Sequence, residues 1–322
     1  MFALSRRPLV VVAVGVVFTS FSAILIRLSS SPPLAIAAYR MVFTVLMLSP
    51  LFILETRRGG HNEHPAETSG TVAETSGAGT GPVPRRRAIL LSVASGTFLS
   101  LHFATWIASL SYTSVASSTV LVTTHPIIVA TLGALFLGER LRFRSMAFIL
   151  AAVGGTVLLV ANGTGEAGST TGNLLAFLGA VAVSGYIILG RVVRQWLSVN
   201  RYTFITYATA AGLLVIYAIV AGVPLFPYPP RELGIFAALA LVCTLLGHSL
   251  FNWALRFVRP SVVSTSILGE PIIATALAVV VFGEVPRPLT IVGGAVILLS
   301  IYLFVRSESG STRHGRIPAR TG

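Results

Sequence analysis

The chain has 322 residues, of which 54% are hydrophobic and only 10% are charged, and its mean hydropathy is +0.85. A soluble domain carries about 25% charged residues, so this composition indicates an integral membrane protein. The net charge of +13 comes from arginines scattered at the ends of apolar runs, which argues against a nucleic-acid partner. The single cysteine, Cys243, excludes a disulfide framework and a cysteine zinc site.

Few residues could carry covalent chemistry. All 23 basic residues are arginine and all ten acidic residues are glutamate, so Schiff-base lysines and aspartate dyads are excluded. The chain has no Walker motif, no zinc-ligand spacing and no nucleophile elbow. We therefore expect no enzyme activity, no cofactor and no metal.

Ten apolar segments predict an all-α membrane protein with ten transmembrane helices, because a spanning helix needs about 20 mostly apolar residues. The first segment follows Arg6 and Arg7 as a signal peptide would, but further apolar segments follow it and we expect it to stay uncleaved. The predicted helices lie at about 8–28, 33–54, 88–109, 115–137, 145–162, 173–190, 202–222, 232–254, 261–282 and 289–305.

The arginines predict the orientation. With the N-terminus in the cytoplasm, 19 of the 23 arginines fall in cytoplasmic segments, three fall in outer segments, and Arg40 lies inside a span. Cytoplasmic loops of membrane proteins carry such an excess of positive charge. We therefore expect a multi-pass protein of the cytoplasmic membrane with both termini in the cytoplasm.

The chain repeats itself with a shift of 145 residues. This shift places Pro126 on Pro271 and Gly138-Glu139 on Gly283-Glu284 without a gap, and a weaker register with a shift of 164 places Arg27 on Arg191. Each unit holds five predicted spans, and an odd number makes the second unit enter the membrane from the opposite side. This is the inverted repeat of many secondary transporters, whose sites lie near the midplane between the halves.

The predicted organisation follows from the repeat. The first five-helix repeat covers 8–162, a linker covers 163–172, the second five-helix repeat covers 173–305, and a basic cytoplasmic tail covers 306–322. Residues 55–87 are rich in Gly, Ser, Thr and Glu and contain AETSG twice, so we expect a disordered cytoplasmic insert there.

The proline within spans four and nine, and the Gly-Glu that closes both spans in LGERL and FGEVP, resemble the EamA-like branch of the drug/metabolite transporter superfamily. Arg40 matches an arginine that this family often carries early in span two. The resemblance implies ten helices and the movement of small metabolites or toxic compounds, often as proton-coupled export. The chain departs from the family at His125-Pro126, where relatives often have Glu-Pro or a small residue, and this leaves the coupling chemistry open.

Span nine carries an acid and a helix breaker near its middle, Glu270-Pro271. An ionised carboxylate at that depth is costly unless it is paired or wetted, and Pro271 frees the carbonyl of Ile267. The repeat places His125, before Pro126, opposite Glu270, and inverted symmetry would bring both to a shared central cavity. A His and a Glu there could relay a proton, since His titrates near neutral pH. The alternative is that Glu270 is protonated and bonds a backbone carbonyl, while His125 bonds a helix hydroxyl.

Other polar or aromatic side chains inside spans are weaker candidates for substrate binding or coupling. Arg40 needs an anion or a route to the surface, so it would pair with Glu270, hold a substrate carboxylate or phosphate, or reach the outer headgroups. Aromatic rings could stack on a substrate, although core packing is the more ordinary role. The remaining candidates are Trp106, Trp253, His102, His248, Asn252 and Ser266.

These features together predict a secondary transporter that moves a small metabolite or drug-like compound by alternating access, as a proton-coupled exporter. The expected partners are a small-molecule substrate, protons and the lipid bilayer, with a homodimer left open. A uniporter or importer of an anionic nutrient held by Arg40 is the alternative within the same fold. A membrane protein without transport activity is a third interpretation.

Overall fold

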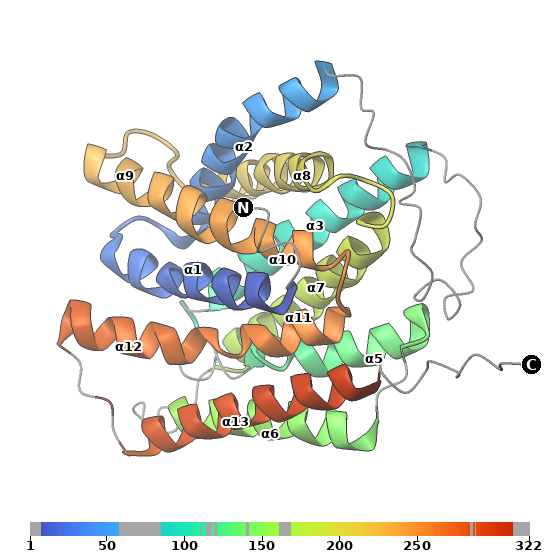
Figure 1. Cartoon of the computed structure of the whole chain (residues 1–322). Coiled ribbons are helices and arrows are strands. Elements are labelled where there is room, and N and C mark those ends of the chain that lie inside the picture. Colours follow the sequence, from blue (N-terminus) through green and yellow to red (C-terminus); the bar gives the residue numbers. More distant parts are fainter. Residues whose placement is uncertain are drawn as a thin grey trace, which may run out of the picture.

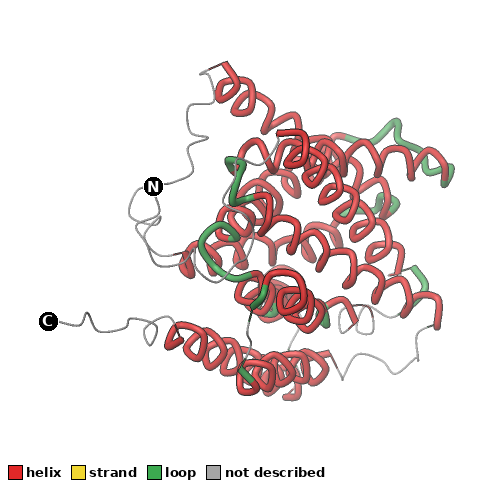
Figure 2. The backbone as a smooth tube through the Cα atoms, turned by 90° about the vertical axis from the view of Figure 1, so that its right-hand side faces the viewer, coloured by secondary structure: helices red, strands yellow, loops and turns green. Residues whose placement is uncertain are grey.

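A computed structural model describes residues 8–57, 85–109, 111–113, 118, 121–139, 142–160, 169–283, 286 and 288–311. The described part of the chain is helical, with no strand (Figure 2). Eight of its helices are long and apolar enough to cross a membrane, and two shorter apolar helices accompany them. The helices of the first half are α1 (Pro8–Leu28), α2 (Pro33–Arg57), α3 (Arg85–Ser109), α5 (His125–Leu137) and α6 (Phe143–Val160).

The second half repeats this order, with two of its spans divided. Its first two helices are α7 (Thr170–Val193) and α8 (Val199–Val220). The third span is built from α9 (Pro230–Ala238), a π-helical stretch η3 (Leu239–His248) and α10 (Ser249–Ala254), the fourth from α11 (Pro260–Ile267) and α12 (Glu270–Phe282), and the last is α13 (Pro288–Ser311). Each of the ten predicted spans therefore overlaps a helical segment of the described residues.

The internal repeat is visible in the helix boundaries. A shift of 145 residues carries the first residues of α3, α5 and α6 onto those of α9, α12 and α13. The helices α5 and α12 both have 13 residues and both end at a glycine in the left-handed region, with φ of 64° at Gly138 and 68° at Gly283. Only glycine adopts this conformation at little cost, so each glycine ends its helix at the same place in its repeat.

Equivalent residues of the two repeats lie at opposite ends of the molecule. Arg27, near the end of α1, lies 4.3 Å from the centroid of the Phe282 ring. Its counterpart Arg191, near the end of α7, donates hydrogen bonds to the carbonyls of Leu255 and Arg256, at 2.7 and 3.0 Å. Because these carbonyls and Phe282 stand at opposite ends of the ninth span, the two repeats have opposite orientations.

The packing of the helices follows the same symmetry. The contacts of α3 with α7 and α8 correspond to those of η3 with α1 and α2, and the contact of α5 with α7 corresponds to that of α12 with α1. The equivalent helices α6 and α13 pack against each other and form the bottom layer of Figure 1, below α12, α11 and α5. The fold is thus an all-α membrane bundle of two inverted five-helix repeats.

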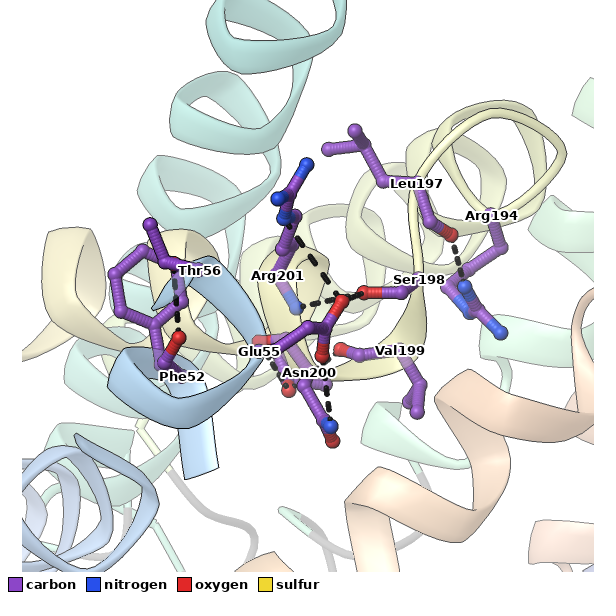
Figure 3. A network of polar contacts seen from close by, with 10 residues as sticks. Phe52, Glu55, Thr56, Arg194, Leu197, Ser198, Val199, Asn200 and Arg201 are labelled. Carbon is purple, nitrogen blue, oxygen red and sulfur yellow. Dashed lines mark hydrogen bonds and ion pairs between the residues drawn. The ribbon is translucent and has the colours of Figure 1, made fainter. Parts of the chain in front are cut away.

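Several predicted boundaries differ from the structure, and the largest difference is in the fourth span, which is predicted at 115–137 but whose helix α5 begins at His125. The helix α2 continues through Arg57, because Glu55 near its end accepts hydrogen bonds from Ser198 and from Asn200 (2.9 Å) and pairs with Arg201 (3.8 Å), all at the start of α8 (Figure 3). Residues 55–57 and 85–87, at the edges of the predicted insert, are therefore helical, and residues 58–84 lie outside the described residues.

Two further boundaries shift for similar reasons. The helix α7 begins at Thr170, inside the predicted linker, because the Ser169 hydroxyl caps it by accepting from the Gly172 N–H at 3.1 Å. The helix α13 runs into the predicted tail as far as Ser311, since Glu308 is fixed by Arg259 and Ser145.

Close helix contact at Gly96 gives a prediction about stability. A Cβ atom at Gly96 in α3 would lie 2.5 Å from the carbonyl oxygen of Thr206 in α8, which is backbone and cannot move aside. We expect Gly96→Ala to destabilise the protein by about 1–3 kcal/mol, as overpacking does, and to lower the unfolding temperature in detergent. Gly212→Ala is the matched control, because a Cβ there meets nothing within 4 Å. An unchanged unfolding temperature for Gly96→Ala would contradict this packing.

Candidate functional site

The ninth span is interrupted at its middle. The helix α11 ends at Ile267 and α12 begins at Glu270, with Pro271 in its first turn and a turn at Leu268 and Gly269 between them. The fourth span has the equivalent arrangement, since α5 begins at His125 with Pro126 in its first turn. A proline is favourable in the first turn of a helix, where its missing N–H is not needed. Each X-Pro pair therefore opens a new helix near mid-span.

Arg40 in α2 is buried, with 2% of its surface exposed. Its Nε donates to the Thr244 hydroxyl in η3 at 2.8 Å, and its Nη1 donates to the Ser22 hydroxyl in α1 at 3.1 Å. The guanidinium carbon lies 4.9 Å from the centroid of the Phe103 ring, a cation–π distance. Nη2 is buried and has no hydrogen-bond partner among the residues that the structure describes. Arg40 thus points into the bundle and does not reach the outer headgroups.

Glu270 is half-buried at the start of α12 and lies next to the hydroxyl of Thr19 in α1. It is close enough to Arg40 for the two charges to interact electrostatically. Within the described part of the chain, however, no ion pair joins the two side chains. Arg40 and Glu270 come from different repeats, so the opposite charges face each other at the junction of the two halves.

His125 has its own set of polar contacts. Its Nδ1 lies 3.1 Å from the Val122 carbonyl oxygen of its own segment, its backbone carbonyl accepts from the Ser184 hydroxyl in α7 at 3.3 Å, and its Nε2 is buried without a partner. No hydrogen bond or ion pair between His125 and Glu270 exists among the described residues. The two residues that the repeat pairs are therefore not bonded directly to each other in the described part of the chain.

The aromatic candidates pack in two ways. His102 and Trp106, four residues apart on α3, stack with ring centroids 5.8 Å apart and planes 6° apart, and His102 Nδ1 lies 2.9 Å from the Gly179 carbonyl. His248 instead meets Phe103 and Phe251 edge to face, with centroids 6.2 and 5.9 Å away. His102 and His248 both lie in the electrostatic neighbourhood of Arg40.

The last three candidates, Trp253, Asn252 and Ser266, make contacts that stabilise the packing of the helices. Trp253 packs on Phe257, with ring centroids 4.5 Å apart. Asn252 is fully buried; its Oδ1 accepts from the Tyr186 hydroxyl, and its Nδ2 donates to the hydroxyls of Tyr186 and Tyr207. The Ser266 hydroxyl donates to the Val262 carbonyl one turn earlier, at 2.8 Å, and so bonds its own helix. Among the described residues, no hydrogen bond joins any of these three to the side chains of Arg40 or Glu270.

Sequence reasoning missed the residues that hold the charges. Thr19, Ser22 and Thr244 position Glu270 and Arg40, and each is an ordinary hydroxyl within an apolar run. The same kind of side chain more often bonds a carbonyl of its own helix, as Thr44 does with the Arg40 carbonyl at 2.7 Å. The only signal in the sequence was the need of Arg40 for polar partners.

The fold and this site define a class. An all-helical membrane bundle of two inverted repeats, with opposite charges at the junction of the halves, has the architecture of a secondary transporter. The family model of the EamA-like transporter family matches residues 6–161 and 170–306, and the chain belongs to this family.

Several curated relatives are named as transporters or exporters. A "Probable terminal-alkyne amino-acid exporter" of Streptantibioticus cattleyicolor is 29% identical over 63% of this chain and 68% of its own. A "Pseudopaline exporter CntI" of Pseudomonas aeruginosa is 23% identical over 70% of this chain and 78% of its own. An "Uncharacterized transporter" of Archaeoglobus fulgidus is 26% identical over 66% of this chain and 74% of its own.

The fold also matches a solved structure. A protein of known crystal structure superposes with a TM-score of 0.72 over 97% of this chain and 99% of its own, at 17% sequence identity. At this identity the likeness concerns the fold. The protein is therefore a multi-pass membrane protein of a transporter family.

Proposed function

We propose that this protein is a proton-coupled exporter of small, amino-acid-like metabolites that works by alternating access. The observation that carries the proposal is the placement of Arg40 and Glu270, which interact across the junction of the repeats without forming an ion pair. A substrate with opposite charges at its two ends would provide a charge partner for each of these two side chains. We also propose the cytoplasmic membrane as its location, with both termini inside, because of the arginine distribution.

The environment of Arg40 is evidence that the substrate carries a carboxylate. A buried charged donor without an acceptor is costly, and the unpartnered Nη2 leaves one direction of the guanidinium unused. A carboxylate is the natural acceptor for such a group, since it offers two oxygens to the N–H groups of an arginine. The relative named as an amino-acid exporter favours the same substrate class, and two relatives named as exporters favour the outward direction.

The position of Glu270 is evidence that substrate export is coupled to proton entry. When no substrate is bound, a proton neutralises the carboxylate in its partly buried position; when an amino acid binds, its ammonium group takes over that role and the proton leaves. Substrate and proton then compete for Glu270, which gives antiport, so that inward proton movement drives export. An anion without an ammonium group would fill only Arg40 and would favour protonation of Glu270. The sign of the proton change thus reports the charge of the true substrate.

The test uses purified protein in weakly buffered detergent with a pH indicator. The probes are the twenty proteinogenic L-amino acids and L-propargylglycine, each with its amide, which lacks the carboxylate, and its N-acetyl derivative, which lacks the ammonium group. We expect at least one amino acid to bind, with release of up to one proton per protein, and its two derivatives to bind more weakly. Binding of amino acids without any proton release would overturn the coupling, and binding of amides alone would overturn the role of Arg40.

A second candidate is a uniporter or importer of an anionic nutrient, which the unpartnered Nη2 of Arg40 also favours. In that case the N-acetyl derivatives or simple carboxylates would bind best, and binding would take up protons or change nothing. The same titration therefore separates the two candidates.

A further inference from the structure

The equivalent helices α5 and α12 differ in how tightly their inner faces are covered. In α5, the buried residues are His125, Pro126, Val129, Ala130 and Gly133. In α12, no residue is buried, and the equivalent residues Glu270, Pro271, Ala274, Thr275 and Ala278 are all partly exposed. The two helices have equal lengths and equivalent caps, so this difference comes from their surroundings.

The outer faces of the same helices do not differ. The exposed positions Thr131, Ala134, Leu135 and Phe136 of α5 correspond to exposed positions 276, 279, 280 and 281 of α12. The greater exposure of α12 is therefore confined to the side of the helix that faces the interior of the bundle. The molecule is closed at the end where α5 terminates and more open at the end where α12 terminates.

An apolar layer fills the closed end. Ala130 of α5, Ile149 of α6, Val262 of α11 and Phe304 of α13 form one buried cluster. These four helices come from both repeats, so the cluster joins the two halves of the molecule. Such a layer excludes water, but it is not directional and does not by itself fix the four helices in register.

Polar contacts lie beside this layer. The Arg259 Nη1 is 2.5 Å from Oε2 of Glu308, whose Oε1 accepts from the Ser145 hydroxyl at 2.7 Å. The Glu139 Oε2 accepts from the Ser261 hydroxyl at 3.2 Å. Burial raises the pKa of Glu139 above its usual value, and the nearby Arg259 acts in the opposite direction.

These contacts join the loop before α11, the C-terminal part of α13, the start of α6 and the residue after the cap of α5. Glu308 is only 7% exposed in its side chain, whereas Arg259 is 37% exposed. Under the 145-residue register, Arg259 and Glu308 correspond to Ser114 and Gly163 in the sequence, so the opposite end cannot form the same pair.

We infer that Arg259 and Glu308, with Ser145 as a third partner, form a latch that holds the α5 end of the transporter closed while the α12 end is open. Breaking the latch would let the α5 end open, and the α12 end would close in return because the two repeats exchange conformations. The inference rests on the alternating access of the proposed function but not on its substrate or its coupling ion.

Two equivalent reporter positions test the latch. Ala130→Cys, the inner reporter, places a thiol in the closed layer, and Thr275→Cys, the outer reporter, places one at the equivalent, partly exposed position of α12. The native Cys243 is fully buried, and its labelling in the otherwise unchanged chain gives the background rate. The measurement is the rate of labelling by fluorescein-5-maleimide in the full-length protein in detergent. We expect slow labelling at the inner reporter and fast labelling at the outer reporter.

The latch is then broken by Arg259→Gln or by Glu308→Gln. Either change should raise the labelling rate of the inner reporter by about tenfold, since both remove the ion pair and Arg259→Gln also leaves the buried Glu308 charge unpaired, and should lower the rate of the outer reporter. Arg259→Lys keeps the charge and should keep the inner reporter slow. Arg256→Gln is the matched control, because the hydrogen bonds made by Arg256 in the described part of the chain use only its backbone N–H and carbonyl.

Opposite changes at the two reporters support the latch, because local unfolding would accelerate both. An unchanged rate at the inner reporter in both broken variants overturns the inference, and so does acceleration at both reporters. These outcomes do not depend on any substrate, so a failure of the latch is distinct from a failure of the proposed transport reaction.

Discussion

Glu270→Gln is expected to abolish substrate-dependent proton release and to reduce proton-driven transport in liposomes to the level of protein-free vesicles. Glutamine keeps the shape and hydrogen-bonding capacity of the side chain but cannot gain or lose a proton in this range. Substrate binding through Arg40 would remain, since that residue has its own partners in Thr244 and Ser22. The variant should therefore bind substrate without releasing protons, measured by calorimetry in two buffers of different ionisation enthalpy.

Glu270→Asp is the matched control for this prediction. Aspartate keeps an ionisable carboxyl one methylene further back, so proton release should persist, with weaker substrate binding. If Glu270→Gln released protons as the unchanged protein does, Glu270 would have a structural role beside Thr19, and the coupling acid would have to be sought elsewhere.

Arg40→Gln is expected to weaken the binding of carboxylate-bearing substrates by about 10- to 100-fold, the range for a lost hydrogen bond to a charged group. The same change removes a buried cation whose Nη2 has no acceptor. Because an uncompensated buried charge is costly, we expect the unfolding temperature of Arg40→Gln to equal or exceed that of the unchanged protein. Loss of binding without loss of stability would mark Arg40 as a residue kept for function.

Arg40→Lys refines this result. A lysine keeps the charge but not the planar set of donors, so it should recover part of the affinity while losing the separate bonds to Thr244 and Ser22. Amides without a carboxylate should bind all three proteins equally. A large fall in the stability of Arg40→Gln, with unchanged substrate affinity in the remaining folded protein, would instead assign Arg40 to the scaffold.

Much of the fold could be predicted from the sequence, because the membrane restricts the choices. Every backbone group within the bilayer needs an internal partner, so apolar segments of sufficient length become helices. The paired glycines Gly138 and Gly283 required a left-handed end at equivalent places, and the 145-residue register follows from them. Helix ends were harder to predict, since Glu55 and Glu308 extend their helices through contacts with residues distant in the sequence.

The candidate site could be predicted only in part. Arg40 and Glu270 were evident because charges inside spans are rare. The hydroxyls that hold them were not, since Thr244 is 204 residues from Arg40 and resembles any other polar residue in a helix. The pairing of His125 with Glu270 followed from symmetry alone, but symmetry relates positions and not contacts. His125 is buried and its carbonyl accepts from Ser184 of the other repeat, whereas Glu270 is partly exposed.

The π-helical stretch η3 has a consequence for the rotation of the eighth span about its axis. A π-helix closes its hydrogen bonds over five residues instead of four, so each turn takes up more residues and later side chains point in a different direction. Thr244 inside the stretch faces Arg40, while Asn252 beyond it faces Tyr186 and Tyr207. The corresponding helix α3 is α-helical throughout and presents one continuous stripe. The wide turns therefore rotate the residues of α10 about the helix axis, relative to α9, away from the positions that a uniform α-helix such as α3 would give them.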